Sequence, residues 1–173
     1  MKTLRWFCAA ALAVALAVPS VQAQEGPKTG PEHEVLKKME GNWDLTMKFG
    51  VMESRGTASY KMGVGGNWLI SEVDLDLFGS KFYGHGMDAY DAATKKYVSY
   101  FFASMGGRPR AMEGIYDNDK KALTLTGEGP GMDEKPTKYR SVTELPDDNT
   151  IQFTMWMGDG KDPFLTITYK RKK

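Results

Sequence analysis

Apolar and polar residues alternate along most of this chain, a pattern typical of strands that bury one face. In residues 43–49, Trp43, Leu45, Met47 and Phe49 are apolar and the residues between them are polar. The same period of two recurs in residues 151–157 and 165–169. Both ends of the alternating region are therefore predicted to be strands.

Turn-forming residues divide the region between these strands at short intervals. The turns are predicted at residues 50–53, 62–67, 79–80, 92–96, 106–109, 118–121, 129–136, 146–149 and 158–163. They cut residues 43–170 into about ten strands. Strands so closely spaced, with no long helix among them, predict an antiparallel all-β fold.

An open sheet of that length would twist strongly and leave two unpaired edges, which favours a closed up-and-down barrel. Such a barrel has room for one small ligand or for a core of large side chains. A β-sandwich is the alternative, because a period of two fits both. One short helix is predicted at residues 31–39, where acidic residues come first, lysines come last and Gly41 follows. This helix can close one end of the barrel.

The first 23 residues have the features of a secretory signal peptide. Lys2 and Arg5 are followed by an apolar run at residues 6–18, which is too short to span a bilayer, and then by small residues up to Ala23. Cleavage after Ala23, and a periplasmic or secreted location, are predicted. An uncleaved anchoring segment is the alternative. Residues 24–30 are predicted to be a flexible leader, and residues 31–173 a single β-barrel domain.

Cleavage would leave 150 of the 173 residues and remove Cys8, the only cysteine. The mature chain would then have no disulfide, no thiol nucleophile and no cysteine ligand for a metal. A domain of that size buries enough surface to fold without such crosslinks. Positive and negative residues nearly balance, 23 against 22 in the full chain, which disfavours binding to nucleic acid. No membrane span is predicted, and no oligomeric state follows from the sequence.

Short motifs that follow one another between residues 30 and 170 carry a resemblance to a known family. They are Gly30, Pro31, Glu32 and His33 with Leu36; Gly41 and Trp43; Gly65, Gly66, Asn67, Trp68 and Leu69; Gly84, His85 and Gly86; Tyr90 and Asp91; and Glu113, Gly114, Tyr116 and Asp117. Their order and spacing resemble the DUF1579 family of bacterial exported proteins. The resemblance implies export and a calycin-like barrel, similar to lipocalins and fatty-acid-binding proteins, with Trp43 on the barrel floor. The family has no established activity, so the resemblance assigns no catalytic residue.

The sequence contains no recognisable catalytic arrangement. His33 and His85 are the only histidines, and no serine lies in a nucleophile-elbow motif. A zinc site would need both histidines, one from the predicted helix and one from a central strand. We therefore predict a protein that is not an enzyme, with no metal site and no cofactor. The hypothesis kept open is that His85, flanked by two glycines, binds haem, although barrel curvature explains these glycines equally well.

A small-molecule site inside the barrel is the favoured functional hypothesis. Methionines can line an adaptable apolar cavity, and Met47 and Met155 join Phe153 on apolar strand faces. Arg140 shares a strand face with Val142, so we predict that it points inward to a ligand carboxylate. The alternatives for Arg140 are an ion pair with Glu144 or Glu113, or a solvent-facing position. The predicted ligand-binding residues are Arg140, Met47, Phe153, Met155 and His85.

The predicted function is therefore that of an exported protein holding an apolar or amphipathic molecule in its barrel. The alternative is an interaction module with a barrel filled by side chains, for which an outward-facing Trp68 and Ile70 would be suited. A third hypothesis is a haem- or copper-binding protein, since thioethers are soft ligands.

Overall fold

The computed structural model describes residues 29–173, which form one short helix followed by ten strands. The elements are α1 (His33–Lys38), β1 (Gly41–Phe49), β2 (Met52–Gly63), a 3-10 turn η1 (Val64–Gly66), β3 (Trp68–Leu77), β4 (Ser80–Asp91), β5 (Lys96–Ala103), β6 (Arg110–Asp117), β7 (Ala122–Pro130), β8 (Pro136–Asp147), β9 (Thr150–Met157) and β10 (Leu165–Arg171). The predicted signal peptide and most of the predicted leader lie outside the described residues.

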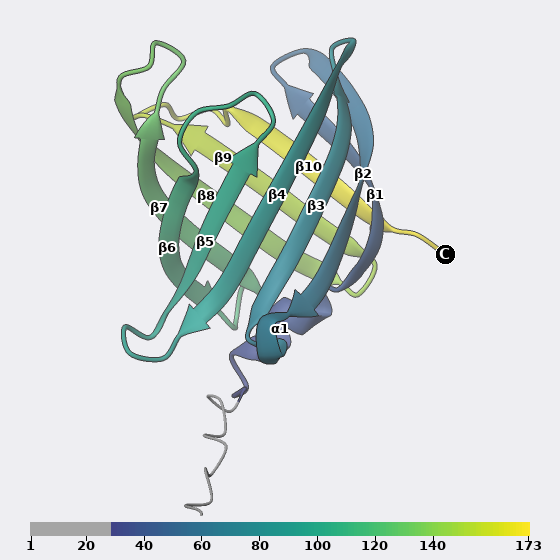
Figure 1. Ribbon diagram of the computed structural model, residues 1–173, viewed down its shortest axis with the longest axis vertical. Coiled ribbons are helices and arrows are strands. Elements are labelled where there is room, and N and C mark those ends of the chain that lie inside the picture. The colour runs from purple at the N-terminus through teal and green to yellow at the C-terminus, as the bar shows by residue number, and fades with distance from the viewer. Residues whose placement is uncertain (1–28) are drawn as a thin grey trace, which may run out of the picture.

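All ten strands pair antiparallel with their neighbours, and the first and last strands close the sheet into a barrel (Figure 1). β1 pairs with β10 over six residue pairs, from Trp43 opposite Arg171 to Lys48 opposite Thr166. The predicted all-β up-and-down barrel is therefore confirmed, and the sandwich alternative is wrong. Closure leaves no edge of this sheet unpaired, because the backbone groups of β1 and β10 hydrogen-bond to each other.

Aspartates fix several of the hairpin turns. The carboxylates of Asp91, Asp117 and Asp147 each accept a hydrogen bond, at 2.8–3.0 Å, from the backbone N–H two residues later. This Asx turn gives a backbone N–H group a local hydrogen-bond acceptor at the point where the strand-to-strand hydrogen bonds end. The turns after β4, β6 and β8, all at the end of the barrel near α1, therefore share one local mechanism.

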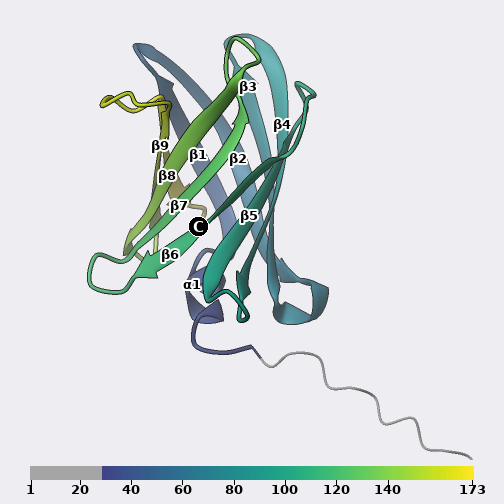
Figure 2. The ribbon, with the colours of Figure 1, turned by 90° about the vertical axis from the view of Figure 1, so that its left-hand side faces the viewer.

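Helix α1 closes one end of the barrel, where it lies beneath the strands in Figures 1 and 2. Leu36 of this helix is fully buried, and Trp43 on β1 is 1% exposed. The indole Nε1 of Trp43 donates a hydrogen bond to the carbonyl of Met39 at 3.0 Å. The guanidinium of Arg171 lies 4.2 Å from the Trp43 ring and donates to the carbonyl of Lys38 at 3.0 Å. The prediction that Trp43 anchors the barrel floor is therefore confirmed.

The core is the inner face of the barrel, but that face is not purely apolar. Leu45, Leu69 and Ile151 are among its most deeply buried side chains. Ser71 and Ser141 are equally buried and point to the same side. Small hydroxyl residues fill less space than leucine or phenylalanine, so the centre of the barrel is not completely packed.

Candidate functional site inside the barrel

A cavity of about 160 Å³ lies inside the barrel. Leu36 of α1 and Met39, the residue after the helix, line it at the closed end of the barrel. Its apolar lining further includes Phe101, Met112, Leu123, Leu125, Ile151, Phe153, Met155 and Leu165. Its polar lining consists of Tyr60, Ser71, Asp88, Ser99, Arg110, Ser141, Thr143 and Tyr169. This combination of an apolar wall with a few convergent polar groups is typical of small-molecule sites.

Asp88 on β4 is the carboxylate of this cavity. The β4 pairings place Asp88 opposite Leu69 of β3 and opposite Ser99 of β5. Asp88 is partly buried and lines the cavity together with Gly86 of the same strand face. Asp88 therefore projects from a rigid, fully paired strand into the interior.

Burial inside the barrel raises the pKa of Asp88 to about 6, and a hydrogen bond with Ser99 lowers it in part. A carboxylate taken out of water costs free energy unless a cation or several hydrogen bonds compensate it. Among the ion pairs of residues 29–173, none involves Asp88. The charge on Asp88 is thus only partly compensated by the protein.

Two tyrosines line the same cavity as Asp88. The rings of Tyr60 on β2 and Tyr169 on β10 are arranged edge to face, with centroids 6.0 Å apart. Burial raises the pKa of both phenols, and negative charge on Asp88 raises each further. All three side chains line the cavity, so the carboxylate and the two phenols belong to one site.

Arg110 is the other charged residue that lines the cavity. It begins β6, at the end of the barrel away from α1, and pairs with Phe101 of β5. Its guanidinium lies 4.6 Å from the centroid of the Tyr139 ring, a cation–π contact. Arg110 forms none of the ion pairs found within residues 29–173. The interior thus contains one carboxylate and one guanidinium that do not pair with each other.

Three of the predicted ligand-binding residues point into the barrel. Phe153 and Met155 on β9 line the cavity directly. Met47 on β1 is buried in the core, 7% exposed, but it is not part of the cavity lining. The strand periodicity therefore identified the inner faces of β1 and β9 correctly.

The predicted inward orientation of Arg140 is wrong. Arg140 lies on the outer face of β8, exposed, with its guanidinium 3.6 Å from the centroid of the Trp156 ring. Ser141 and Tyr139 face inward in its place, and Val142 faces outward with Arg140. The prediction assumed that the branched apolar Val142 marks the inner face. The inner face of β8 instead carries the buried Tyr139 and Leu145, and Val142 is an apolar exception on the charged outer face.

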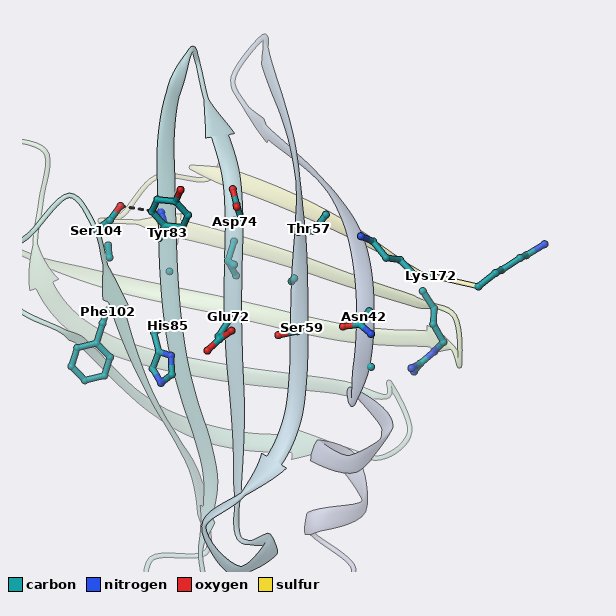
Figure 3. A pocket seen from close by; sticks show the side chains of 17 residues that line it. Asn42, Thr57, Ser59, Glu72, Asp74, Tyr83, His85, Phe102, Ser104 and Lys172 are labelled. Carbon is teal, nitrogen blue, oxygen red and sulfur yellow. Dashed lines mark hydrogen bonds between the residues drawn. The ribbon is translucent and has the colours of Figure 1, made fainter.

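His85 does not belong to the interior site either. It lies on the outer face of β4, in an open groove across β1–β5 that also contains Glu72 and Phe102 (Figure 3). The neighbouring Gly84 and Gly86 face inward, where a β-carbon on Gly84 would overlap the ring of Phe101. These glycines therefore make room for an aromatic side chain inside the barrel. His85 is therefore not part of the cavity inside the barrel, and its role in binding a ligand stays a prediction.

Sequence analysis missed Asp88, Arg110 and the two tyrosines. The sequence contains a signal for two of these residues. Asp88 shares its strand face with Phe82 and Tyr90, and Arg110 shares its strand face with Met112. A charged residue can share a strand face with apolar residues for two reasons. Either that face has been wrongly assigned to the interior and the residue lies outside, or the residue is buried because it has a structural or functional role. The strand phase alone does not separate these two cases.

Residues 29–173 contain no group of three or more His, Cys, Asp or Glu side chains placed to hold a metal ion. No helix within that range has the length and apolar character needed to cross a membrane. His33, the first residue of α1, is buried, and its Nδ1 accepts a hydrogen bond from the backbone N–H of Gly30 at 3.2 Å. The two histidines thus lie at different places, one under the barrel and one on its outer wall.

Comparison with known proteins gives a family. A family model described as "Protein of unknown function (DUF1579)" matches residues 28–171. No curated protein matches the chain. Among solved structures, a redesigned beta barrel is similar at 14% identity and a TM-score of 0.36, covering 80% of this chain and 96% of that chain.

Proposed function

The chain belongs to the DUF1579 family, whose function is unknown, and we propose that this member is an exported binding protein that holds a small amphipathic molecule inside its barrel. The observation that supports it is the cavity of about 160 Å³ beside the partly compensated carboxylate of Asp88. A protein selected for stability alone would gain by replacing such a group with an apolar one. Its retention inside the barrel is explained if a ligand uses it.

The size of the cavity limits the ligand. Drug-sized ligands occupy pockets of about 300–1,000 Å³, whereas an apolar cavity of about 150 Å³ holds benzene. A cavity of about 160 Å³ therefore fits a molecule of one small ring or a short branched chain. A medium-chain fatty acid, the ligand suggested by the resemblance to calycins, would require the surrounding methionines and Phe101 to move.

Export is the second part of the proposal. It rests on the signal-like residues 1–23, with their basic start, short apolar run and small residues up to Ala23. In that setting the barrel would work in the periplasm or outside the cell. Binding without catalysis is proposed because the cavity lining includes no histidine, no cysteine and a single carboxylate.

The test is native mass spectrometry of the protein purified from its own host, with a variant whose cavity is filled. Met112 lies 8% exposed on the inner face of β6, so Met112→Trp would occupy the cavity. Ala111→Trp, one residue away on the outer face, introduces the same side chain without entering the interior. We expect a bound small molecule on the parent and on Ala111→Trp, and none on Met112→Trp.

Two outcomes would contradict the proposal. One is a parent protein that carries no small molecule and gains none when incubated with an extract of its host. The other is a molecule retained equally by Met112→Trp while that variant melts cooperatively, since the molecule would then lie elsewhere. If Met112→Trp does not fold, the smaller Met112→Phe serves in its place.

A second candidate function is protein interaction through the outer wall. Tyr83, Tyr100 and Phe102 are 54%, 40% and 45% exposed on the outer faces of β4 and β5. Exposed aromatic side chains are common in protein interfaces. Phe102→Ser would then abolish capture of a host protein and leave any bound small molecule in place, whereas no loss of capture would exclude this face.

A further inference from the structure

We propose that the ligand of the barrel carries an ammonium group, which pairs with Asp88 beside Tyr60 and Tyr169. This inference rests on the proposed function, because it names the class of molecule that the interior cavity would bind. The class is a small organic amine with an apolar body. Three features of the cavity support it, namely the unfilled acceptor sites of Asp88, the two tyrosines and the distribution of charge.

The first feature is the acceptor capacity of Asp88. An ionised carboxylate has about four lone-pair sites, and the protein supplies Ser99 as its hydrogen-bonding neighbour. The remaining sites face a cavity with room for a ligand atom. An ammonium group carries three N–H donors and a full positive charge, so it can satisfy these sites and compensate the charge together.

The second feature is the pair of tyrosines. Aromatic faces attract cations, and the attraction strengthens when the cation is removed from water. Tyr169 is 5% exposed and Tyr60 is partly buried, with their rings edge to face, and both line the cavity that Asp88 lines. A small cavity that holds a carboxylate and two aromatic rings is chemically suited to an organic cation and unsuited to an anion.

The third feature is where the opposite charge lies. Arg110 reaches the cavity from the end away from α1, where Tyr139 holds its guanidinium, and it forms no ion pair with Asp88. The other cavity-lining residues nearest Asp88 on adjacent strands are Ser71 and Ser99, which are neutral. An anionic ligand in so small a cavity would place a second negative charge near Asp88, whereas a cationic ligand supplies the compensation that Arg110 does not.

The experiment compares three compounds that share one ring and differ in charge: benzylamine, benzyl alcohol and benzoate. Each is titrated calorimetrically into the mature protein at pH 7.5. We expect benzylamine to bind at least about tenfold more tightly than the other two. Its affinity should also rise between pH 5 and pH 7, because ionisation of Asp88 with its pKa of about 6 creates the binding charge.

Asp88→Asn tests the role of the carboxylate, since asparagine keeps the shape and removes the charge. Benzylamine affinity should fall by about tenfold or more in this variant, and its pH dependence should disappear. Benzyl alcohol should bind the variant within about threefold of the parent, which would show that the cavity is intact. Asp74→Asn, on the exposed outer face of β3, should change none of these affinities.

The outcomes separate this inference from the proposed function. If benzoate or benzyl alcohol binds the parent as tightly as benzylamine, or Asp88→Asn retains benzylamine, the ammonium assignment is overturned while the binding cavity stands. If no compound binds and the protein from its own host carries no small molecule, both proposals are overturned.

Discussion

Replacing Asp88 by Asn should stabilise the empty protein, and only at neutral pH. Burial raises the pKa of Asp88 from an ordinary 3.8 to about 6, so the folded protein holds this proton more tightly than the unfolded chain does. Between these two pH values the folded state binds more protons, and stability falls as the pH rises. Below pH 4 Asp88 is protonated in both states and the cost of burying its charge is absent, and above pH 7 that cost is complete.

The size of the effect follows from the shift. One pKa unit corresponds to about 1.36 kcal/mol, so a shift of about 2 units costs the folded protein about 3 kcal/mol above pH 7. Asn avoids this cost because it has no charge, although its amide also needs hydrogen-bonding partners in the cavity. For a domain of about 150 residues, 3 kcal/mol corresponds to about 6–12 °C in Tm.

Urea unfolding of the mature protein at pH 4 and pH 8 measures this difference directly. Asp88→Asn should match the parent at pH 4 and exceed its free energy of unfolding by about 2–3 kcal/mol at pH 8. The matched control is Asp74→Asn, an exposed position on the outer face of β3, where the gain should stay below about 1 kcal/mol at either pH. A variant less stable than the parent at pH 8 would refute the reasoning, because it would mean that the ionised carboxylate is well compensated inside the empty barrel.

Three further predictions concern the framework around the cavity and the N-terminal segment. Trp43→Ala should lower the free energy of unfolding by about 3–5 kcal/mol, since the side chain is 1% exposed and holds α1 through Met39; urea unfolding that shows a loss under 1 kcal/mol would contradict this. Gly114→Ala should cost about 1–3 kcal/mol or more, because the added carbon would overlap the carbonyl oxygen of Thr124 on β7, and an unchanged melting curve would exclude such close strand contact. N-terminal sequencing of the exported protein should begin at or near Gln24, and an intact residue 1 would show that the segment is not a cleaved signal.

The division of the chain into strands could be predicted from the sequence because several turns have a local chemical cause. Asp91, Asp117 and Asp147 fix their turns through local hydrogen bonds, which depend on a few adjacent residues. Barrel closure was predicted only indirectly, because an open sheet of ten strands would leave two edges unpaired. The pairing of β1 with β10 joins residues 118 to 128 positions apart, and no local pattern records it.

The candidate site was less predictable, because alternation gives two strand faces without saying which one is inside. On β9 the inner face carries Phe153 and Met155, so hydrophobicity identified it. On β8 the inner face carries Ser141 and Thr143 and the outer face carries Val142, so the same rule placed Arg140 on the wrong side. Val142 alone was misleading there. The inner face of β8 also carries the buried Tyr139 and Leu145, and its outer face carries the exposed Lys138 and Glu144.

Methyl groups of methionine offer the most direct test of whether the interior cavity binds a ligand. Met112 and Met155 line the cavity, whereas Met105 and Met132 lie in loops and are 75% and 76% exposed. In methyl-labelled mature protein, titration with benzylamine should shift the NMR signals of Met112 and Met155 and leave those of Met105 and Met132 in place. Shifts confined to the two loop methionines, or no shift at any of the four at millimolar benzylamine, would contradict an amine-binding cavity inside this barrel.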